Sequence, residues 1–273
     1  MYGRILVPVV VPANVGPLVR MASYLLEPGG EIDVLHVITS RSMPEMAKGW
    51  RNSLQVVIPA HETGAALDVN VVPEVKVAPD AAVEILERAE SQRADAIVMT
   101  LSGFGKKRIN PFFGHTTGAI IHHATCDVII VNRLALTMNR VGKVLIPTFT
   151  VQPPHRVMLA AEAVSGKKGD VPIVTLHMLE GNAFSSEAVP HTLTGSAANI
   201  PRRLKTVIFP SRLFRRQSTL PDMFLNVVQR EGYGLYIVGE EGRGLKSPLL
   251  TRGFIERLFA RAPCPVMVIK GRE

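Results

Sequence analysis

Cysteine is nearly absent from this sequence: only Cys126 and Cys264 occur among its 273 residues. Two cysteines cannot build a disulfide framework, so the fold must rest on an apolar core, for which 47% hydrophobic residues are ample. Apolar runs long enough to cross a bilayer are also missing, as is a charged and then apolar signal segment at the start. We therefore expect a soluble globular protein of the reducing cytoplasm.

Motifs of catalysis are missing as well. The sequence contains no nucleophile elbow, no G-x4-G-K-[ST] phosphate loop and no pair of acids that we can place in one site. Both cysteines precede apolar runs, in "HHATCDVIIV" and "ARAPCPVMVI", which indicates structural rather than redox roles. We therefore expect that the protein is not an enzyme.

Positive charge is in excess, with a formal net charge of +8. Such a balance favours an anionic partner: a nucleotide, a nucleic acid or the inner surface of a membrane. Aromatic residues make up only 5% of the chain, too few for base-stacking platforms, so we disfavour nucleic acid. Two basic clusters are either solvated surface or a docking area for acidic proteins or lipid headgroups. They consist of Arg202, Arg203 and Lys205, and of Arg212, Arg215 and Arg216.

The strongest signal in the sequence is internal repetition. "GRILVPV" at 3–9 returns as "GKVLIPT" at 142–148, and "AIVMTLSGFG" at 96–105 returns as "LYIVGEEGRG" at 235–244. "VLHVI" and "ATCDVIIV" return in the same order as "TLHML" and "APCPVMVI". Ordered matches at a nearly constant spacing indicate two tandem copies. We predict one domain over 1–135 and a second over 141–273, with the seam at 132–140.

Each copy alternates short β-branched runs with helical patterns, which is typical of a parallel sheet covered by helices. We predict an α/β fold with two open, twisted, five-stranded parallel sheets and helices on both faces. The predicted strands are 3–9, 32–38, 68–77, 96–101 and 127–132, then 142–148, 171–178, 204–209, 234–238 and 265–269. The predicted helices of the first copy are 14–26, 44–64, 79–92 and 116–124. In the second copy the alternation requires a helix between 180 and 200, where the periodicity is poor.

These motifs, in order and twice over, resemble the universal stress protein family. The resemblance rests on "ILVP" in the first strand, "LH" in the second, a glycine loop after the fourth and a cysteine before the fifth, and it covers nearly the whole chain. It implies a fold related to the adenine-nucleotide-binding α/β folds. It also implies that two such domains pair through their last strands, here within one chain as a pseudo-dimer, with a homodimer as a further possibility.

Family members that bind ATP carry G-x2-G-x9-G and then Ser or Thr after the fourth strand, where backbone N–H groups and a helix N-terminus hold the phosphates. The resemblance therefore makes the two loops candidate sites for ATP or another adenine nucleotide. Both loops are one residue longer than the pattern, and neither has a hydroxyl directly after its last glycine. The candidate residues are Gly103, Gly105, Lys106, Gly114, His115 and Thr116 in the first copy and Gly239, Gly242 and Gly253 in the second.

A second departure from the family lies at the end of the first strand, where nucleotide-binding relatives carry an aspartate that helps to hold the nucleoside. This sequence has Val10 and Phe149 at the two corresponding positions, and neither side chain can accept a hydrogen bond. The nucleotide site is thus incomplete in both copies. A disused site and a working, altered site both stay open, and no cofactor is assigned.

A metal site is an alternative for the histidines that precede the last strand of the first copy. His122 and Cys126 stand four residues apart, a spacing that brings two ligands to one face of a helix. Cys126 aligns with Cys264, however, and the second copy has no matching histidines, so we assign no metal. We interpret His36 and His177, in the "LH" motifs, as structural.

Three functions follow as hypotheses. The first is a cytoplasmic, non-catalytic regulatory or stress-response adaptor with degenerate ATP-binding loops. The second is the cytoplasmic regulatory domain of a membrane transporter, or a partner of one, because "VPVVVPANVGPLVRMASYLL" resembles the opening of stress-type domains attached to transporters. The third is a sensor that binds ATP, AMP or a cyclic nucleotide through the altered loops.

Overall fold

The computed structural model of the protein divides into two units. The first comprises Met1–Val131 and Lys270–Glu273, and the second comprises Asn132–Ile269. Most of the predicted seam, residues 133–140, lies outside the residues that the structure describes. The described residues are 1–39, 43–100, 114–132, 142–148, 153–166, 171–181, 185–187, 202–210, 222, 224–226, 232–239 and 252–270.

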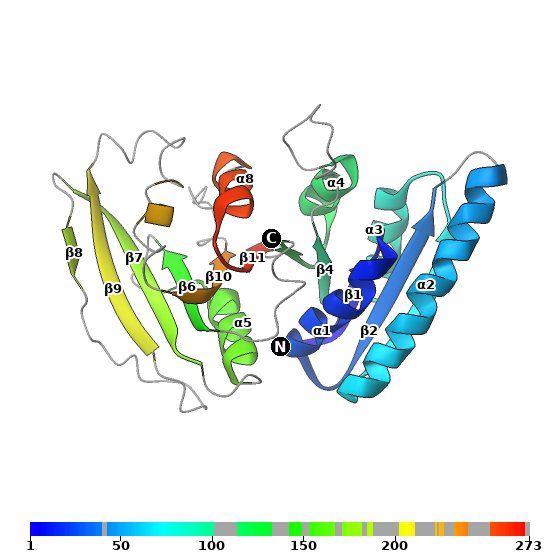
Figure 1. Ribbon diagram of the computed structural model, residues 1–273, viewed down its shortest axis with the longest axis horizontal. Coiled ribbons are helices and arrows are strands. Elements are labelled where there is room, and N and C mark those ends of the chain that lie inside the picture. The colour runs from blue at the N-terminus through cyan, green and yellow to red at the C-terminus, as the bar shows by residue number, and fades with distance from the viewer. Residues whose placement is uncertain are drawn as a thin grey trace. The chain divides into compact units, whose positions relative to one another are not determined.

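The first unit places its first strand in the middle of its sheet. β1 (Tyr2–Pro8) pairs in parallel with β2 (Leu26–Ile38) on one side and with β4 (Ala96–Thr100) on the other. β3 (Asn70–Val77) continues the sheet beyond β2, and β5 (Asp127–Val131) continues it beyond β4. The resulting order, β3-β2-β1-β4-β5, is that of a doubly wound parallel sheet (Figure 1).

Both faces of this sheet are covered. Every residue of β5 and the first four residues of β4 are buried, and neighbouring side chains on a strand point to opposite faces, so neither face is open to solvent there. Two helix pairs provide the cover: α1 (Val15–Leu25) packs against α2 (Met43–Leu67), and α3 (Ala81–Ser91) packs against α4 (His115–His123). A short 3-10 turn, η1 (Pro12–Asn14), leads into α1.

The start of α3 shows how the sequence sets a helix boundary. Asp80 precedes the helix with extended backbone, and its Oδ1 atom accepts hydrogen bonds from the N–H groups of Ala82 at 2.7 Å and Val83 at 3.3 Å. These bonds satisfy donors that the first turn of a helix leaves without an intrahelical partner. Ile85 and Ala89 then bury one face, as the periodicity of the sequence predicts.

The second unit has five parallel strands in the corresponding order. β6 (Lys143–Thr148) lies between β7 (Ile173–Gly181) and β10 (Tyr233–Gly239). β9 (Arg202–Pro210) lies beyond β7, and β11 (Val266–Lys270) lies beyond β10. The predicted α/β class with a mainly parallel sheet is therefore confirmed.

The second unit differs from the prediction at its outer edge. β8 (Ser185–Glu187) pairs antiparallel with β9, so this sheet has one more strand than predicted and is not wholly parallel. The helix predicted between 180 and 200 is wrong for 185–187, and 182–184 and 188–200 lie outside the described residues. The short segment "SSE" carries no apolar stripe that a helix could bury, whereas an edge strand needs only backbone bonds to its neighbour. The described helices of this unit include α5 (His155–Gly166) and α8 (Arg252–Arg261).

The first unit differs from the prediction where β2 begins. The prediction starts this strand at residue 32, whereas its pairing with β1 already begins at Leu26 and is interrupted before Glu31 by a bulge. Gly29 in the bulge has a φ of +79°, and a Cβ atom on Gly30 would lie 2.7 Å from the carbonyl oxygen of Gly3. Both glycines are thus required by the backbone path. The residues "EPGG" have low strand propensity and are typical of a turn, so the sequence did not predict the early part of the strand.

α2 lies close to the sheet because the residues that it turns inward are small. A Cβ atom on Gly49 would lie 2.6 Å from a methyl carbon of Ile38, and one on Gly64 would lie 2.6 Å from a methyl carbon of Val71. Ser53, between them, is buried. The helix could not keep this distance from the sheet with larger residues on its inner face.

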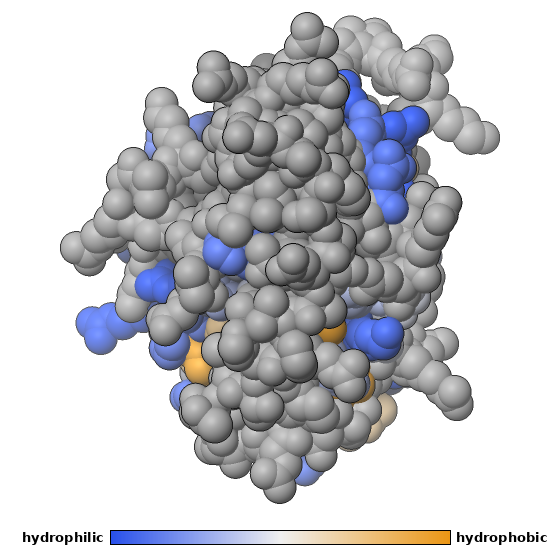
Figure 2. Space-filling view, turned by 90° about the vertical axis from the view of Figure 1, so that its left-hand side faces the viewer, coloured by the Kyte–Doolittle hydropathy of each residue, from blue (hydrophilic) through white to orange (hydrophobic). Residues whose placement is uncertain are grey.

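The large hydrophobic residues that remain exposed, among those described, all belong to the first unit. They are Met1, Val10, Val11, Trp50, Leu54, Ile58, Val72, Val77 and Val83. Figure 2 views the molecule from the left-hand side of Figure 1. The described residues that are coloured on that face are mostly hydrophilic, with hydrophobic ones in small spots only.

Gly64→Ala tests the close packing of α2. Alanine is the better helix former by about 1 kcal/mol, but the new methyl group would collide with Val71 and approach the carbonyl oxygen of Val69 at 3.1 Å. We therefore expect a net loss of about 1 to 2 kcal/mol in the free energy of unfolding, measured in urea. The matched control is Gly118→Ala in α4, where nothing lies within 4 Å of the new atom and where stability should stay level or rise. Equal changes in the two variants would contradict the packing interpretation.

Candidate functional site

The candidate site of the first unit lies at the point where the winding of the sheet reverses. β2 lies on one side of β1 and β4 lies on the other, so the chain leaves the carboxyl ends of β1 and β4 toward opposite sides. In open parallel sheets, ligands bind in the crevice that this reversal creates. The described residues nearest to it are Val9 and Val10 after β1 and the start of α4 after the loop that follows β4.

His36 anchors the end of β1 beside this point. Its ring nitrogen Nδ1 lies 2.9 Å from the carbonyl oxygen of Val9, which accepts the hydrogen bond, and the side chain is buried. The N–H of Val9 donates in turn to the carbonyl oxygen of Leu35 at 2.8 Å. The structural interpretation of His36 is therefore confirmed. His177 is likewise buried, on β7 in register with Thr148.

Val10, which follows Val9 after the end of β1, is 66% exposed. It occupies the position at which nucleotide-binding relatives, by the resemblance above, carry aspartate. The hydrogen-bonded end of β1 thus presents an apolar side chain to solvent, where such relatives present a hydrogen-bond acceptor.

The start of α4 brings three of the predicted residues together. Gly114 is the N-cap, and its carbonyl oxygen accepts a hydrogen bond from the N–H of Gly118 at 3.0 Å. His115 is exposed, Thr116 is half-buried and Thr117 is fully buried. The N–H groups of a first helical turn can hold an anion, so the arrangement suits a phosphate chemically, although His115 stands where the ATP-binding pattern has a hydroxyl.

Of the candidate glycines of the second unit, Gly239 has a packing role. A Cβ atom on Gly239 would lie 2.0 Å from a methyl carbon of Val157 in α5, so the end of β10 requires glycine for close approach of the helix. Gly253 lies inside α8, which begins at Arg252, and is not its cap. Phe254 follows it and is fully buried, with its ring centroid 6.0 Å from that of Phe224.

The other predicted site residues lie outside the described part of the chain. They are Gly103, Gly105 and Lys106 in the first loop and Gly242 in the second. The same holds for Phe149 at the end of β6 and for Lys107 and Arg108. The described portion of the site is therefore the end of β1 and the first turn of α4.

The metal alternative fails on helix geometry. α4 ends at His123, and Ala124 has extended backbone with φ −65° and ψ 132°, so Cys126 does not lie on the helix that carries His122. His122 is exposed whereas Cys126 is buried, so the two side chains have different surroundings. Among the described residues no group of three or more His, Cys, Asp or Glu side chains could hold a metal ion.

Burial makes the thiol of Cys264 a poor nucleophile. Desolvation raises its pKa to about 12, although contact with Tyr236 acts in the opposite direction. The thiolate is the reactive form of cysteine, and the thiols of Cys126 and Cys264 are both buried and form no disulfide. These surroundings agree with the structural role that the sequence indicates for the two cysteines.

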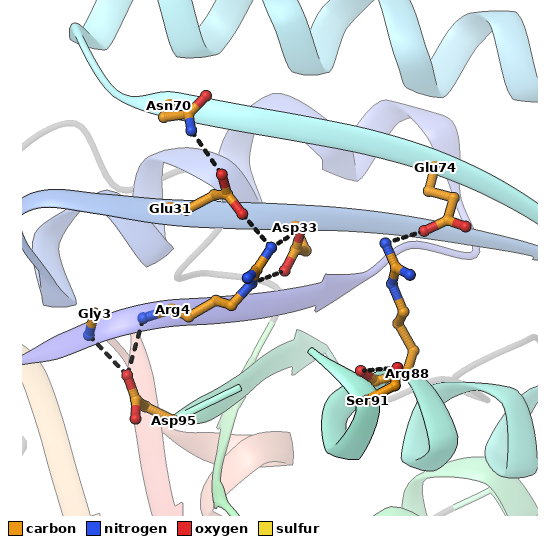
Figure 3. Close-up of polar contacts among 9 residues, drawn as sticks. All are labelled: Gly3, Arg4, Glu31, Asp33, Asn70, Glu74, Arg88, Ser91 and Asp95. Carbon is orange, nitrogen blue, oxygen red and sulfur yellow. Dashed lines mark hydrogen bonds and ion pairs between the residues drawn. The ribbon is translucent and has the colours of Figure 1, made fainter. Parts of the chain in front are cut away.

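A charged network lies at the opposite, amino-terminal end of the strands of the first unit (Figure 3). Arg4 donates from Nε to Asp33 at 2.7 Å and forms a second ion pair with Glu31. The carboxylate of Asp95 accepts the N–H groups of Gly3 and Arg4, each at 2.9 Å. The hydrogen bond to Asp33, whose side chain is only 3% exposed, raises the pKa of Arg4 above its ordinary value.

Sequence reasoning did not single out this network. The available signal was a charged residue inside each of two apolar runs, "GRILVPV" and "EIDVLHV". Charges of opposite sign at the starts of strands that pair in parallel would be expected to meet. The network pairs the buried carboxylate of Asp33 with a cation, and it lies at the other end of the strands from the candidate site.

These features define a class of protein: a doubly wound α/β protein in which the carboxyl ends of β1 and β4 form the crevice where ligands of such sheets bind. Residues 1–132 match the model of the universal stress protein family, which covers just under half of the chain. No curated protein matches the chain.

Solved structures extend the likeness of fold to nearly the whole chain. A universal stress protein from Archaeoglobus fulgidus DSM 4304 is 17% identical, with a TM-score of 0.65 and coverage of 99% of each chain. The cytoplasmic domain of a prokaryotic cation chloride cotransporter is 11% identical, with a TM-score of 0.59 and coverage of 98% of this chain and 95% of that one. Within the described residues, no helix has the length and hydropathy to cross a bilayer.

Arg4→Met tests the charged network. The variant leaves the carboxylate of Asp33 buried without its cation, so we expect a loss of about 2 to 3 kcal/mol in the free energy of unfolding. This loss is smaller than that for a fully buried ion pair, because Arg4 is 33% exposed. Arg4→Met combined with Asp33→Leu should recover most of the loss, because the buried carboxylate is removed, while that of Glu31 is 27% exposed and keeps its hydrogen bond from Asn70. The matched control is Lys76→Met, which removes an exposed ion pair with Glu74 and should cost less than about 1 kcal/mol. Urea unfolding in which the double variant is no more stable than Arg4→Met would contradict this account.

Proposed function

We propose that the protein is a non-catalytic regulatory adaptor built on the universal stress protein fold, in which the former phosphate loops no longer hold ATP. The observation that carries the proposal is Val10, a 66% exposed apolar side chain at the position of the nucleoside-binding aspartate. A nucleoside there would lose a charge-assisted hydrogen bond and gain nothing in return.

The scaffold around that position supports the same proposal. His36 still ties the end of β1 through Val9, and Gly114 still caps α4. The backbone that carries a nucleotide site is therefore kept, while the side chain that would recognise the nucleoside is replaced. Such a domain would act through its contacts with other molecules and not through chemistry on a bound ligand.

A second candidate is a domain of, or partner to, a membrane transporter. It is favoured by the likeness of nearly the whole chain to the cytoplasmic domain of a cation chloride cotransporter. The formal net charge of +8 supports it, because a cationic domain is attracted to the anionic lipids of an inner membrane surface.

The adaptor proposal predicts an empty protein. Acid extraction of the purified chain should release no stoichiometric adenine nucleotide, and calorimetric titration with ATP or AMP should give no dissociation constant tighter than about 1 mM. Val10→Asp restores the missing acceptor and should make AMP binding measurable. The control Val11→Asp adds the same charge at the neighbouring, 51% exposed position and should not.

Stoichiometric nucleotide or micromolar binding in the unmodified protein would reject the adaptor and favour the sensor. Gly114→Asp would then locate the site, since a side chain at the N-cap blocks the approach of a phosphate to the first turn of α4. Unchanged affinity in that variant would reject the first loop as the site.

The transporter candidate predicts binding to an anionic surface. The full chain should co-sediment with vesicles that contain about 30% phosphatidylserine at low salt, and should be released at about 0.3 M salt because the attraction is screened. Vesicles of phosphatidylcholine alone are the control. Absence of binding at low salt would count against a role at the membrane.

A further inference from the structure

In α2 the small residues face the sheet and large apolar residues face solvent, the reverse of an ordinary amphipathic helix. Apart from the fully buried Val56, the inner face of α2 consists of small residues such as Gly49 and Gly64, while three large apolar residues face solvent. Trp50 is 50% exposed, Leu54 is 61% exposed and Ile58 is 53% exposed. Trp50 is also the single tryptophan of the chain. Isolated exposed apolar residues are ordinary on protein surfaces, but a row of three on one helix is not.

These residues lie on one side of the outer face of the helix, where the exposed His61 also stands between Ile58 and Ala65. They stand four residues apart, and the exposed Ala47 and Ala65 extend the row at its two ends with the helical spacing of three, four and seven residues. We call the set Ala47, Trp50, Leu54, Ile58 and Ala65 the α2 stripe. In Figure 1, α2 lies along the outer side of the first unit, beyond β2.

The α2 stripe is complementary to itself when two copies of the helix run antiparallel. If Leu54 of one copy lies opposite Ile58 of the other, two-fold symmetry places Ile58 opposite Leu54 as well, so four large residues meet at the centre. The same register brings Ala47 opposite Ala65, which leaves room for the two helix ends to approach. With 25 residues, α2 is about 37 Å long, enough for contact over several turns.

The charges beside the stripe agree with this register. Arg51 and Glu62 are both exposed, at opposite ends of the stripe. In the antiparallel arrangement, Arg51 of one copy lies next to Glu62 of the other, and the pair occurs twice by symmetry. A membrane surface would favour basic residues at both ends of the stripe, whereas Glu62 and the exposed Asp68 place negative charge at its carboxyl end.

We propose that the α2 stripe is a docking surface for a second copy of this chain, formed by antiparallel packing of the two α2 helices. Trp50, Leu54 and Ile58 are the anchors of the interface, and tryptophan in particular is enriched at the centres of such interfaces. The proposal does not rest on the nucleotide question, because α2 carries none of the predicted site residues.

Sedimentation velocity of the full chain from about 1 to 100 μM tests the proposal, since this range spans the dissociation constants of modest interfaces. We expect a concentration-dependent dimer. Leu54→Glu should weaken it at least tenfold by placing a charge in the centre of the contact. The matched control is Val83→Glu on α3, at an equally apolar and 52% exposed position off the stripe, which should leave the dimer unchanged. Leu54 is exposed, so circular dichroism and urea unfolding should show an intact fold in both variants.

Charge exchange tests the orientation. Arg51→Glu and Glu62→Arg should each weaken the dimer, because each creates two repelling pairs, and the double variant should restore it to within about threefold of the unmodified chain. This recovery is specific to the antiparallel register.

Three results would overturn the proposal. One is a chain that stays monomeric at 100 μM. Another is a dimer that Leu54→Glu leaves intact. The third is a dimer whose charge exchange gives no recovery. If the chain is monomeric and Leu54→Glu instead abolishes its binding to phosphatidylserine vesicles, the stripe serves a lipid surface and not a second copy.

Discussion

The first unit depends on β1, which pairs on both sides and is buried on both faces. Ile5 and Val7 are fully inaccessible to solvent, and the strand holds β2 and β4 in register. A strand in this position has no free edge and no exposed face, so only its two ends can carry polar chemistry. The charged network occupies the amino end, and the candidate site occupies the carboxyl end.

The two units support the amino end of their central strand in different ways. In the repeat, Gly3 corresponds to Gly142, and Asp95 corresponds to Gly234. In the first unit the carboxylate of Asp95 accepts the N–H of Gly3, whereas in the second a Cβ atom on Gly234 would lie only 2.1 Å from the nitrogen of Gly142. A charged side chain in one unit is thus replaced in the other by direct approach of two backbones. The first position is glycine in both units and only the residue that faces it differs, which the sequence repeat alone would have shown as an unexplained mismatch.

At the carboxyl end of β1, the residues that hold the backbone in place differ from those that would contact a ligand. The contact of His36 with Val9 and the cap of α4 at Gly114 are properties of the scaffold, and a ligand is not needed to explain them. Val10 and His115 are the positions at which a ligand would be recognised, and both depart from the nucleotide-binding pattern while remaining exposed. The proposed loss of nucleotide binding and the proposed role of α2 as a contact surface describe the same kind of protein, one that works by association.

The sequence by itself determined the α/β class and most of the strand positions, because apolar runs that are buried on both faces leave a signal that does not depend on distant residues. It also determined the start of α3 at Asp80 and indicated the structural role of His36. Only the tertiary structure decided that "EPGG" belongs to a bulged strand, that "SSE" forms an antiparallel edge, and that Gly239 makes room for Val157. Each of these is settled by a neighbour far along the chain. The orientation of α2 was decided in the same way: small and large apolar residues both fit a helical period, and the sheet selects the small ones because they allow the closer approach.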